Sequence, residues 1–160
     1  MQNTAKHLRE TVNGVLPLLG AVSDTEASVS PAPGKWSKKE ILGHLIDSAC
    51  NNQQKFVRAM EASGIEFTGY KQNFWVESQK YNEAGWTGLI ALWRAYNNHI
   101  AHIIEHADPG CLANEIIIED AGTFILRFIM EDYVEHLKHH LLQILPASGL
   151  TTKFQNIYNT

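Results

Sequence analysis

The stretch EDYVEHLKHHLLQ, residues 131–143, has the spacing of apolar residues that is typical of an amphipathic helix. It also places His136 and His140 four residues apart, and positions i and i+4 of an α-helix lie on the same face. Two neutral imidazoles on one face supply half of a site for a first-row metal ion. The remaining ligand must come from another part of the fold, and the segment WSKKEILGHLID, residues 36–47, offers His44.

The apolar residues of this helix define where its histidines point. At 100° per residue, His136 and His140 lie roughly 50–90° from the centre of the apolar stripe, on a flank that can face a neighbouring helix. His139 lies about 150° from that centre, which predicts that it is exposed to solvent. The stripe consists of Leu126, Met130, Tyr133, Leu137, Leu141 and Ile144.

Four segments have helical periodicity, and together they predict an all-α fold, a four-helix bundle. Ser37 and Glu40 form a capping box that predicts the start of the second helix. Pro17 is expected to bend or shorten the end of the first helix, and Pro146 to end the fourth, with Thr123 as its N-cap. The predicted helices span about residues 3–19, 37–62, 86–107 and 123–145.

The segments between these helices carry different signals. Residues 20–36 contain two prolines and a glycine within four positions, which predicts a linker that is not helical. Residues 115–119 fit a short strand or an extended turn. Residues 63–84 have no periodicity, but they are so aromatic that we expect this loop to pack over the bundle. The aromatic residues are Phe67, Tyr70, Phe74, Trp75 and Tyr81.

Length and composition narrow the class of protein. The chain has 160 residues, 44% of them hydrophobic, and this size predicts one domain over residues 1–160, with a core of about 3–146 and a tail of 147–160. The net charge of −4 without basic clusters argues against a nucleic-acid partner. Without a signal-peptide pattern or a long apolar run, we expect no membrane partner. Cys50 and Cys111 are interpreted as reduced thiols, so the expected location is cytoplasmic.

The remaining candidate ligands are less clearly placed. His99, His102 and His106 share one face of their predicted helix, about 100–160° from its apolar stripe, which indicates a solvated surface. His44 lies roughly 140° from the centre of its own stripe, on the same side as Asp47. That side is either solvated or borders a cleft between helices, and the spacing alone leaves both interpretations open.

Two long segments and two short ones resemble a known family. The segments KWSKKEILGHLIDS (residues 35–48) and DYVEHLKHHLLQI (132–144), with FWVESQKYN (74–82) and LWRAYN (92–97), are similar to the DinB-like superfamily. Its members are small bacterial four-helix proteins, among them YfiT-type metal hydrolases and transferases that use bacillithiol or mycothiol. The similarity covers about residues 5–146.

The resemblance implies a ligand set and a function. In that family a divalent metal ion, often assigned as zinc or nickel, lies between three histidines, and their positions match His44, His136 and His140 here. It therefore implies that His44 is the third ligand. It also implies a metal-dependent hydrolase or a low-molecular-weight-thiol S-transferase with a small-molecule substrate, and a homodimer, since related proteins often pair.

Such a site would have characteristic neighbours. Three imidazoles leave positions on the ion for water or substrate, which is typical of a catalytic site. Asp47 and Asp132 are candidates to accept the ring NH groups of the ligands, and Gln143 to contact metal-bound water, with surface solvation as the alternative for all three. The alternative function is a metal-binding or stress-associated protein without turnover. A thiol substrate would need cations for its carboxylates, and the candidates are Lys35, Lys38, Lys39 and Lys71.

Overall fold

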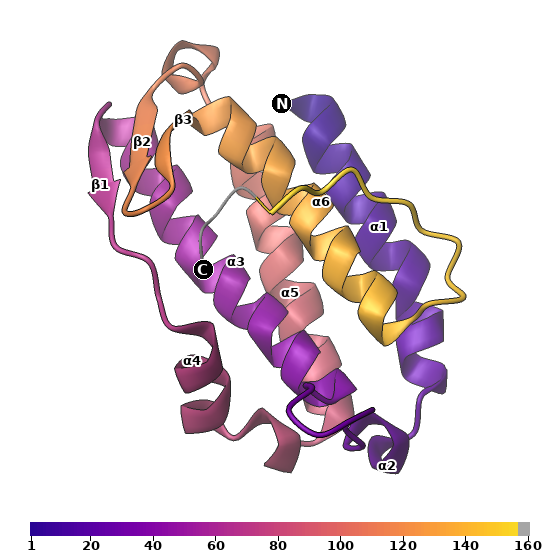
Figure 1. Ribbon diagram of the computed structural model, residues 1–160. Coiled ribbons are helices and arrows are strands. Elements are labelled where there is room, and N and C mark those ends of the chain that lie inside the picture. Colours follow the sequence, from indigo (N-terminus) through magenta and orange to yellow (C-terminus); the bar gives the residue numbers. More distant parts are fainter. Residues whose placement is uncertain (157–160) are drawn as a thin grey trace.

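Four long helices form a bundle in the computed structural model, which describes residues 1–156 (Figure 1). This architecture confirms the predicted four-helix bundle. A small sheet lies at one end of the bundle, and the short helices α2 and α4 lie toward the other. In chain order the elements are α1 (Gln2–Ala21), α2 (Asp24–Ala27), α3 (Lys38–Glu61), β1 (Ile65–Phe67), α4 (Gln72–Gln79), the 3₁₀ turn η1 (Tyr81–Glu83), α5 (Trp86–Glu105), the 3₁₀ turn η2 (Pro109–Cys111), β2 (Glu115–Ile118), β3 (Gly122–Ile125) and α6 (Leu126–Ile144).

The helices are neighbours in an order that differs from their order in the chain. α1 packs against α5, α5 against α3, α3 against α6, and α6 against α1. α3 and α6 therefore lie side by side, although α4, α5 and the sheet separate them in the sequence (Figure 1). The side chains that fill the space between the helices include Leu8, Leu19, Leu42, Leu45, Phe56, Trp93, Ile100, Ile104 and Met130.

α3 begins where the capping box predicts. Ser37 Oγ accepts a hydrogen bond of 3.2 Å from the backbone NH of Glu40, and Glu40 Oε2 accepts one of 2.7 Å from the NH of Ser37. Further along, Gly43 lies against the ring of Tyr81, and a Cβ atom at this position would overlap that ring. Residues 41–49 are all buried, so the N-terminal half of α3 is enclosed on every side.

The linker after α1 is partly helical, contrary to the prediction. α2 is capped by Ser23, whose Oγ accepts a hydrogen bond of 3.1 Å from the NH of Glu26. Asp24 then accepts hydrogen bonds from the NH of Trp86 at 2.8 Å and from Nζ of Lys39 at 2.9 Å. These contacts fasten α2 to α5 and α3, and they stabilise a helix that is too short to show a periodic pattern.

Two helix ends also differ from the predicted ones. α1 continues past Pro17 to Ala21, because Leu19 is fully buried and the proline removes only one backbone hydrogen bond near the helix end. α6 begins at Leu126 rather than at Thr123, because the residues before it form β3.

The sheet has three short strands. β1 pairs with β2 in parallel, and β2 pairs with β3 in antiparallel orientation. β2 confirms the strand expected within residues 115–119. At the turn from β2 into β3, Asp120 and the first residue of β3, Gly122, have φ angles of 61° and 111°, and residues with positive φ are typical of tight hairpins. Thr123 therefore pairs with Ile117 in the sheet instead of capping α6.

Residues 63–84 have more regular structure than the expected loop, because they contain β1, α4 and η1. The expected packing over the bundle is confirmed for Val76 and Tyr81, which are buried, whereas Phe74 is 64% exposed. This segment covers the side of α3 that α5 and α6 leave open.

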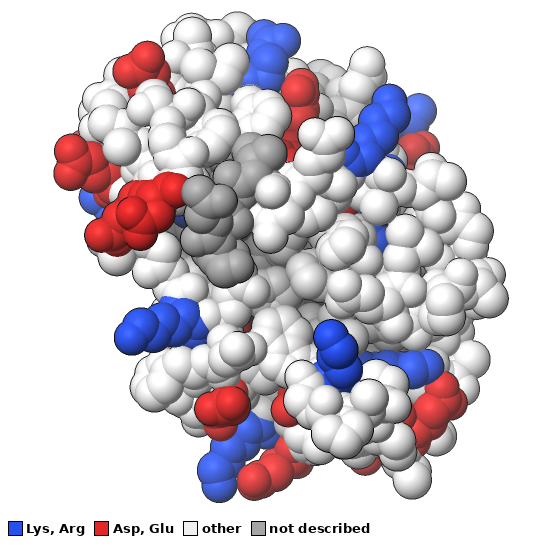
Figure 2. Space-filling model, viewed as in Figure 1, with Lys and Arg blue, Asp and Glu red and all other residues white. Residues whose placement is uncertain are grey.

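The surface carries charges of both signs. On the face drawn in Figure 2, Lys and Arg side chains of the described residues alternate with Asp and Glu and do not gather in one area. Within residues 1–156, no helix is both long enough and apolar enough to cross a bilayer.

Candidate metal centre

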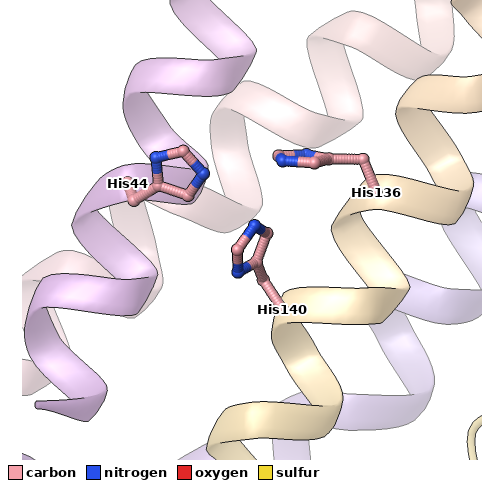
Figure 3. A group of neighbouring side chains, drawn as sticks. All are labelled: His44, His136 and His140. Atoms are coloured by element: carbon pink, nitrogen blue, oxygen red, sulfur yellow. The ribbon is translucent and has the colours of Figure 1, made fainter. Parts of the chain in front are cut away.

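Three histidines from two helices converge between α3 and α6 (Figure 3). The ring centroid of His44 lies 4.7 Å from that of His140 and 5.4 Å from that of His136, and the two rings on α6 are 4.6 Å apart. One nitrogen atom from each ring can be chosen so that all three lie within 4.8 Å of one another. The structure thus brings together the three residues that the sequence singles out.

The two ring nitrogens of His44 are buried without a hydrogen-bond partner among the described residues. The residue is 1% exposed. A buried polar group without a partner costs about 1–3 kcal/mol. Zn–N bonds of about 2.0–2.1 Å would place tetrahedral ligand nitrogens roughly 3.4 Å apart. Small side-chain rotations would bring the three nitrogens to that spacing, so these residues fit a divalent ion.

All three imidazoles are neutral near neutral pH. Burial, and then the charge of His140, lower the pKa of His44 to about 3. Burial also lowers the pKa of His140 to about 4, although the hydrogen bond that His140 donates to Gln143 opposes this shift. The pKa of His136 lies well below its usual value, again chiefly because of burial. Neutral imidazoles keep the lone pairs that a metal ion requires.

Gln143 contacts the ring of one candidate ligand, His140, and the ring of the neighbouring His139. Its Oε1 accepts a hydrogen bond of 3.0 Å from Nδ1 of His140, and its Nε2 donates to Nε2 of His139 at 3.2 Å. An amide oxygen can only accept, so Nδ1 of His140 carries the proton and Nε2 keeps its lone pair. Orientation of a metal-binding imidazole by such a partner is typical of metal sites.

The two acidic candidates have different positions. Asp47 makes no hydrogen bond to the ring of His44. Its Oδ1 accepts hydrogen bonds from Tyr81 Oη at 2.7 Å and Gln79 Nε2 at 2.8 Å, and its Oδ2 has no partner among the described residues. Asp47 instead fastens the segment of residues 63–84 to α3. Burial raises the pKa of Asp47, although these two hydrogen bonds oppose the shift. Asp132 lines the cavity next to the histidines.

A cavity of about 350 Å³ opens beside the three rings, between α3 and α6. His44 lies in its wall, and Ser48, Asn52 and Lys55 continue that wall along α3. Tyr70, from the segment of residues 63–84, also lines the cavity. Such a space accommodates a small molecule in contact with the histidines.

Two aromatic side chains that the sequence analysis does not single out flank the site. The ring of Trp36 lies 5.2 Å from that of His44. The ring of Phe154 lies 5.2 Å from each of the rings of His136 and His139. His139 is therefore half-buried, and its expected full exposure is wrong.

Phe154 reaches this position because the chain after α6 turns back across that helix (Figure 1). Thr152 Oγ1 donates a hydrogen bond of 2.8 Å to the carbonyl of Glu135, and the NH of Lys153 donates one of 2.7 Å to Glu135 Oε2. Burial alone would raise the pKa of Glu135, but the hydrogen bonds from Lys153 and Lys138 lower it overall.

Comparisons with known proteins identify the family and the fold. The model of the DinB superfamily matches residues 7–144. The chain belongs to the DinB superfamily. Among solved structures, the DinB fold described here resembles YfiT from Bacillus subtilis, described as a probable metal-dependent hydrolase with an unusual four-helix bundle topology. The TM-score is 0.81 at 18% identity, and the match covers 90% of this chain and 83% of that chain. No curated protein matches the sequence significantly.

A second group of histidines in this DinB protein lies away from the cavity. His99, His102 and His106 are exposed on α5, as expected. Ligand atoms of His102, His106 and Glu105 lie within 4.8 Å of one another. However, Glu105 forms an ion pair of 2.6 Å with Arg9, which occupies its carboxylate.

The lysines considered for a thiol substrate do not line the DinB cavity. Lys38 pairs with Glu26 at 2.7 Å and Lys39 with Asp24 at 2.9 Å. Both ion pairs hold α2 against α3. Lys35 and Lys71 are exposed.

Proposed function

We propose that this protein binds one divalent metal ion through His44, His136 and His140 and uses it to hydrolyse a small molecule held in the adjacent cavity. The convergence of three neutral imidazoles, one of them buried with both nitrogens unpartnered, carries this proposal. A bound divalent ion would lower the pKa of water and polarise a carbonyl or phosphoryl group. The similarity to YfiT, described as a probable metal-dependent hydrolase, supports it.

The protein's own residues would orient the three imidazole rings and exclude water from their surroundings. Gln143 fixes the ring of His140, and Trp36 and Phe154 pack beside the other rings. The three histidines leave the remaining coordination positions for water and substrate. Imidazole suits both zinc and nickel, and we propose one of these two as the ion.

A transferase that joins a low-molecular-weight thiol to an electrophile would use the same residues. A thiolate would then take the open position that water takes in a hydrolase. One observation favours this second candidate: the cavity contains a cation, Lys55, that suits a thiol bearing a carboxylate. The homodimer expected from the sequence stays a prediction, which light scattering can check.

Metal binding is tested by removing the metal from purified protein with a chelator and reloading it with zinc or nickel. We expect one ion per chain by elemental analysis, and none in the double variant His136→Ala/His140→Ala. The matched control is His102→Ala/His106→Ala, which removes an exposed pair with the same spacing on α5. Full occupancy in the first double variant would contradict the proposal, as would loss of the ion in the control alone.

The reaction is tested with esters, amides and phosphoesters, with and without metal, and with thiols plus electrophiles. Metal-dependent hydrolysis without thiol supports the hydrolase. Turnover only in the presence of thiol supports the transferase. A protein that binds the ion but shows no turnover in either screen would belong to the non-catalytic alternative.

A further inference from the structure

One face of α3 runs from the metal centre to a lysine. His44, Ser48 and Asn52 follow one another at intervals of four, and Lys55 comes three residues later, so all four lie along one side of the helix. All four line the cavity. Eleven residues of helix correspond to a rise of about 16 Å. Side chains on a helix lean toward its N-terminus, so Lys55 leans toward the histidines.

Lys55 is the one Lys or Arg that lines the cavity among the described residues. It is half-buried, and within residues 1–156 its ammonium group makes no hydrogen bond or ion pair. Burial lowers its pKa, while the charge of Asp132 opposes this shift. The positive charge of Lys55 also helps to lower the pKa of His136, although burial has the largest effect. These effects place the ammonium group within electrostatic range of both the metal centre and Asp132.

The ammonium group of Lys55 is therefore available to a negatively charged group of a ligand in the cavity. We propose that Lys55 binds a carboxylate of the substrate while another group of the same molecule occupies the open position of the metal centre. This proposal rests on the metal centre proposed above and adds the substrate class: a small molecule with a carboxylate at a distance from its reacting group.

The surroundings favour a monoanion over a phosphate dianion. Lys55 is the single cation that the described residues contribute to the cavity, and the carboxylate of Asp132 repels additional negative charge. Two other polar groups of the cavity, on Tyr70 and Asn52, carry no charge. Burial raises the pKa of Tyr70, so its hydroxyl stays a hydrogen-bond donor. Asn52 Nδ2 already donates to the carbonyl of Ser48 at 2.9 Å.

The test uses protein loaded with cobalt(II), whose charge-transfer absorption reports a bound thiolate. The probes are 4-mercaptobutyrate and its uncharged amide, 4-mercaptobutanamide, which carry the same metal-binding thiol. A charge-assisted hydrogen bond to Lys55 is expected to make the acid bind roughly tenfold tighter or more. Lys55→Met should abolish this preference without weakening the amide, and Lys55→Arg should retain most of it. Lys71→Met, at an exposed lysine outside the cavity, is the control.

The outcomes separate the two proposals. Failure to take up cobalt would contradict the metal centre itself. Cobalt uptake with equal affinity for the two probes would overturn the assignment of Lys55 alone. The same preference in Lys55→Met would also overturn it, because the carboxylate would then be bound to the metal. If Lys55→Met does not fold, Asp132→Asn replaces it: loss of the competing charge should increase the preference for the acid, and an unchanged preference would contradict the proposal.

Discussion

Gln143 accepts a hydrogen bond of 3.0 Å from Nδ1 of His140, one turn earlier on α6. The amide oxygen fixes the tautomer of this imidazole and leaves Nε2 as its free acceptor. The contact lies between residues three positions apart on a single helix, so α6 alone supplies both of its groups. The ring of this candidate ligand is therefore oriented by the protein itself.

Loss of this orienting contact should weaken metal binding. We expect Gln143→Ala to lower the affinity for zinc by roughly 10–100-fold, the range typical of partners of metal-binding histidines. Competition with a chromophoric chelator measures the affinity. Gln143→Glu keeps an acceptor and adds a negative charge, so it should bind at least as tightly as the wild type. Equal affinity of Gln143→Ala and the wild type would show that the hydrogen bond has no part in binding.

The buried imidazoles should make the metal-free protein sensitive to acid. In the unfolded chain these histidines have a pKa of about 6.5, whereas in the folded protein the pKa is about 3 for His44 and about 4 for His140. Below pH 6.5 the unfolded state binds protons that the folded state does not. Stability is therefore full above about pH 6.5, and each such histidine lowers it by about 1.4 kcal/mol per pH unit as the pH falls toward the folded pKa.

Urea unfolding of metal-free protein at pH 7.0 and pH 5.5 measures this loss. His44→Ala should flatten the dependence on pH, whereas His102→Ala, at an exposed position, should leave it unchanged. An equally steep loss in wild type and His44→Ala would show that other groups cause the acid sensitivity.

Gly43 should resist substitution although it lies within a helix. Alanine is favoured over glycine in helices by about 1 kcal/mol, but a Cβ atom here would overlap the ring of Tyr81. We expect Gly43→Ala to destabilise the protein by about 1–3 kcal/mol, the usual cost of overpacking. The control is Gly14→Ala on α1, where a Cβ atom meets nothing within 4 Å and should stabilise the helix. Chemical denaturation measures both, and a stabilised Gly43→Ala would refute the close contact.

Phe154 should control access to the centre more than affinity for the ion. Its ring covers His136 and His139 without offering a ligand. Phe154→Ala should therefore release the ion to a strong chelator several times faster, with a similar equilibrium affinity. Stopped-flow transfer of zinc to the chelator measures the rate. Phe74→Ala, at a ring that is 64% exposed, should release the ion at the wild-type rate. Identical rates in all three proteins would show that Phe154 does not restrict access.

The sequence predicts the candidate ligands on α6 more securely than the candidate ligand on α3. His136 and His140 are related by helical geometry alone, and the structure places both beside the cavity. The angle of His44 indicates a polar side that could equally be solvated, yet the residue is 1% exposed. Helical periodicity compares a residue only with its own helix. It does not show that residues 63–84 cover α3 on the remaining side, so a polar face becomes an interior one.

Periodic patterns do not predict the short elements either, because these elements depend on contacts with other parts of the fold. α2 has four residues and depends on Asp24, which binds partners on two other helices. β3 forms because it pairs with β2. Considered without that pairing, the same residues have the sequence pattern of a helix N-terminus. Phe154 lies ten residues beyond α6 and reaches His136 only because Glu135 anchors the returning chain.

The order of the helices around the bundle has a consequence for how the protein opens. His44 and His136 lie on helices that are neighbours in space but distant in the chain. A bound ion would therefore cross-link α3 to α6. Local unfolding would then begin at other helix contacts and not at the contact between α3 and α6. Amide hydrogens there should exchange slowly in the loaded protein and much faster after chelation, whereas those between α1 and α5 should change little.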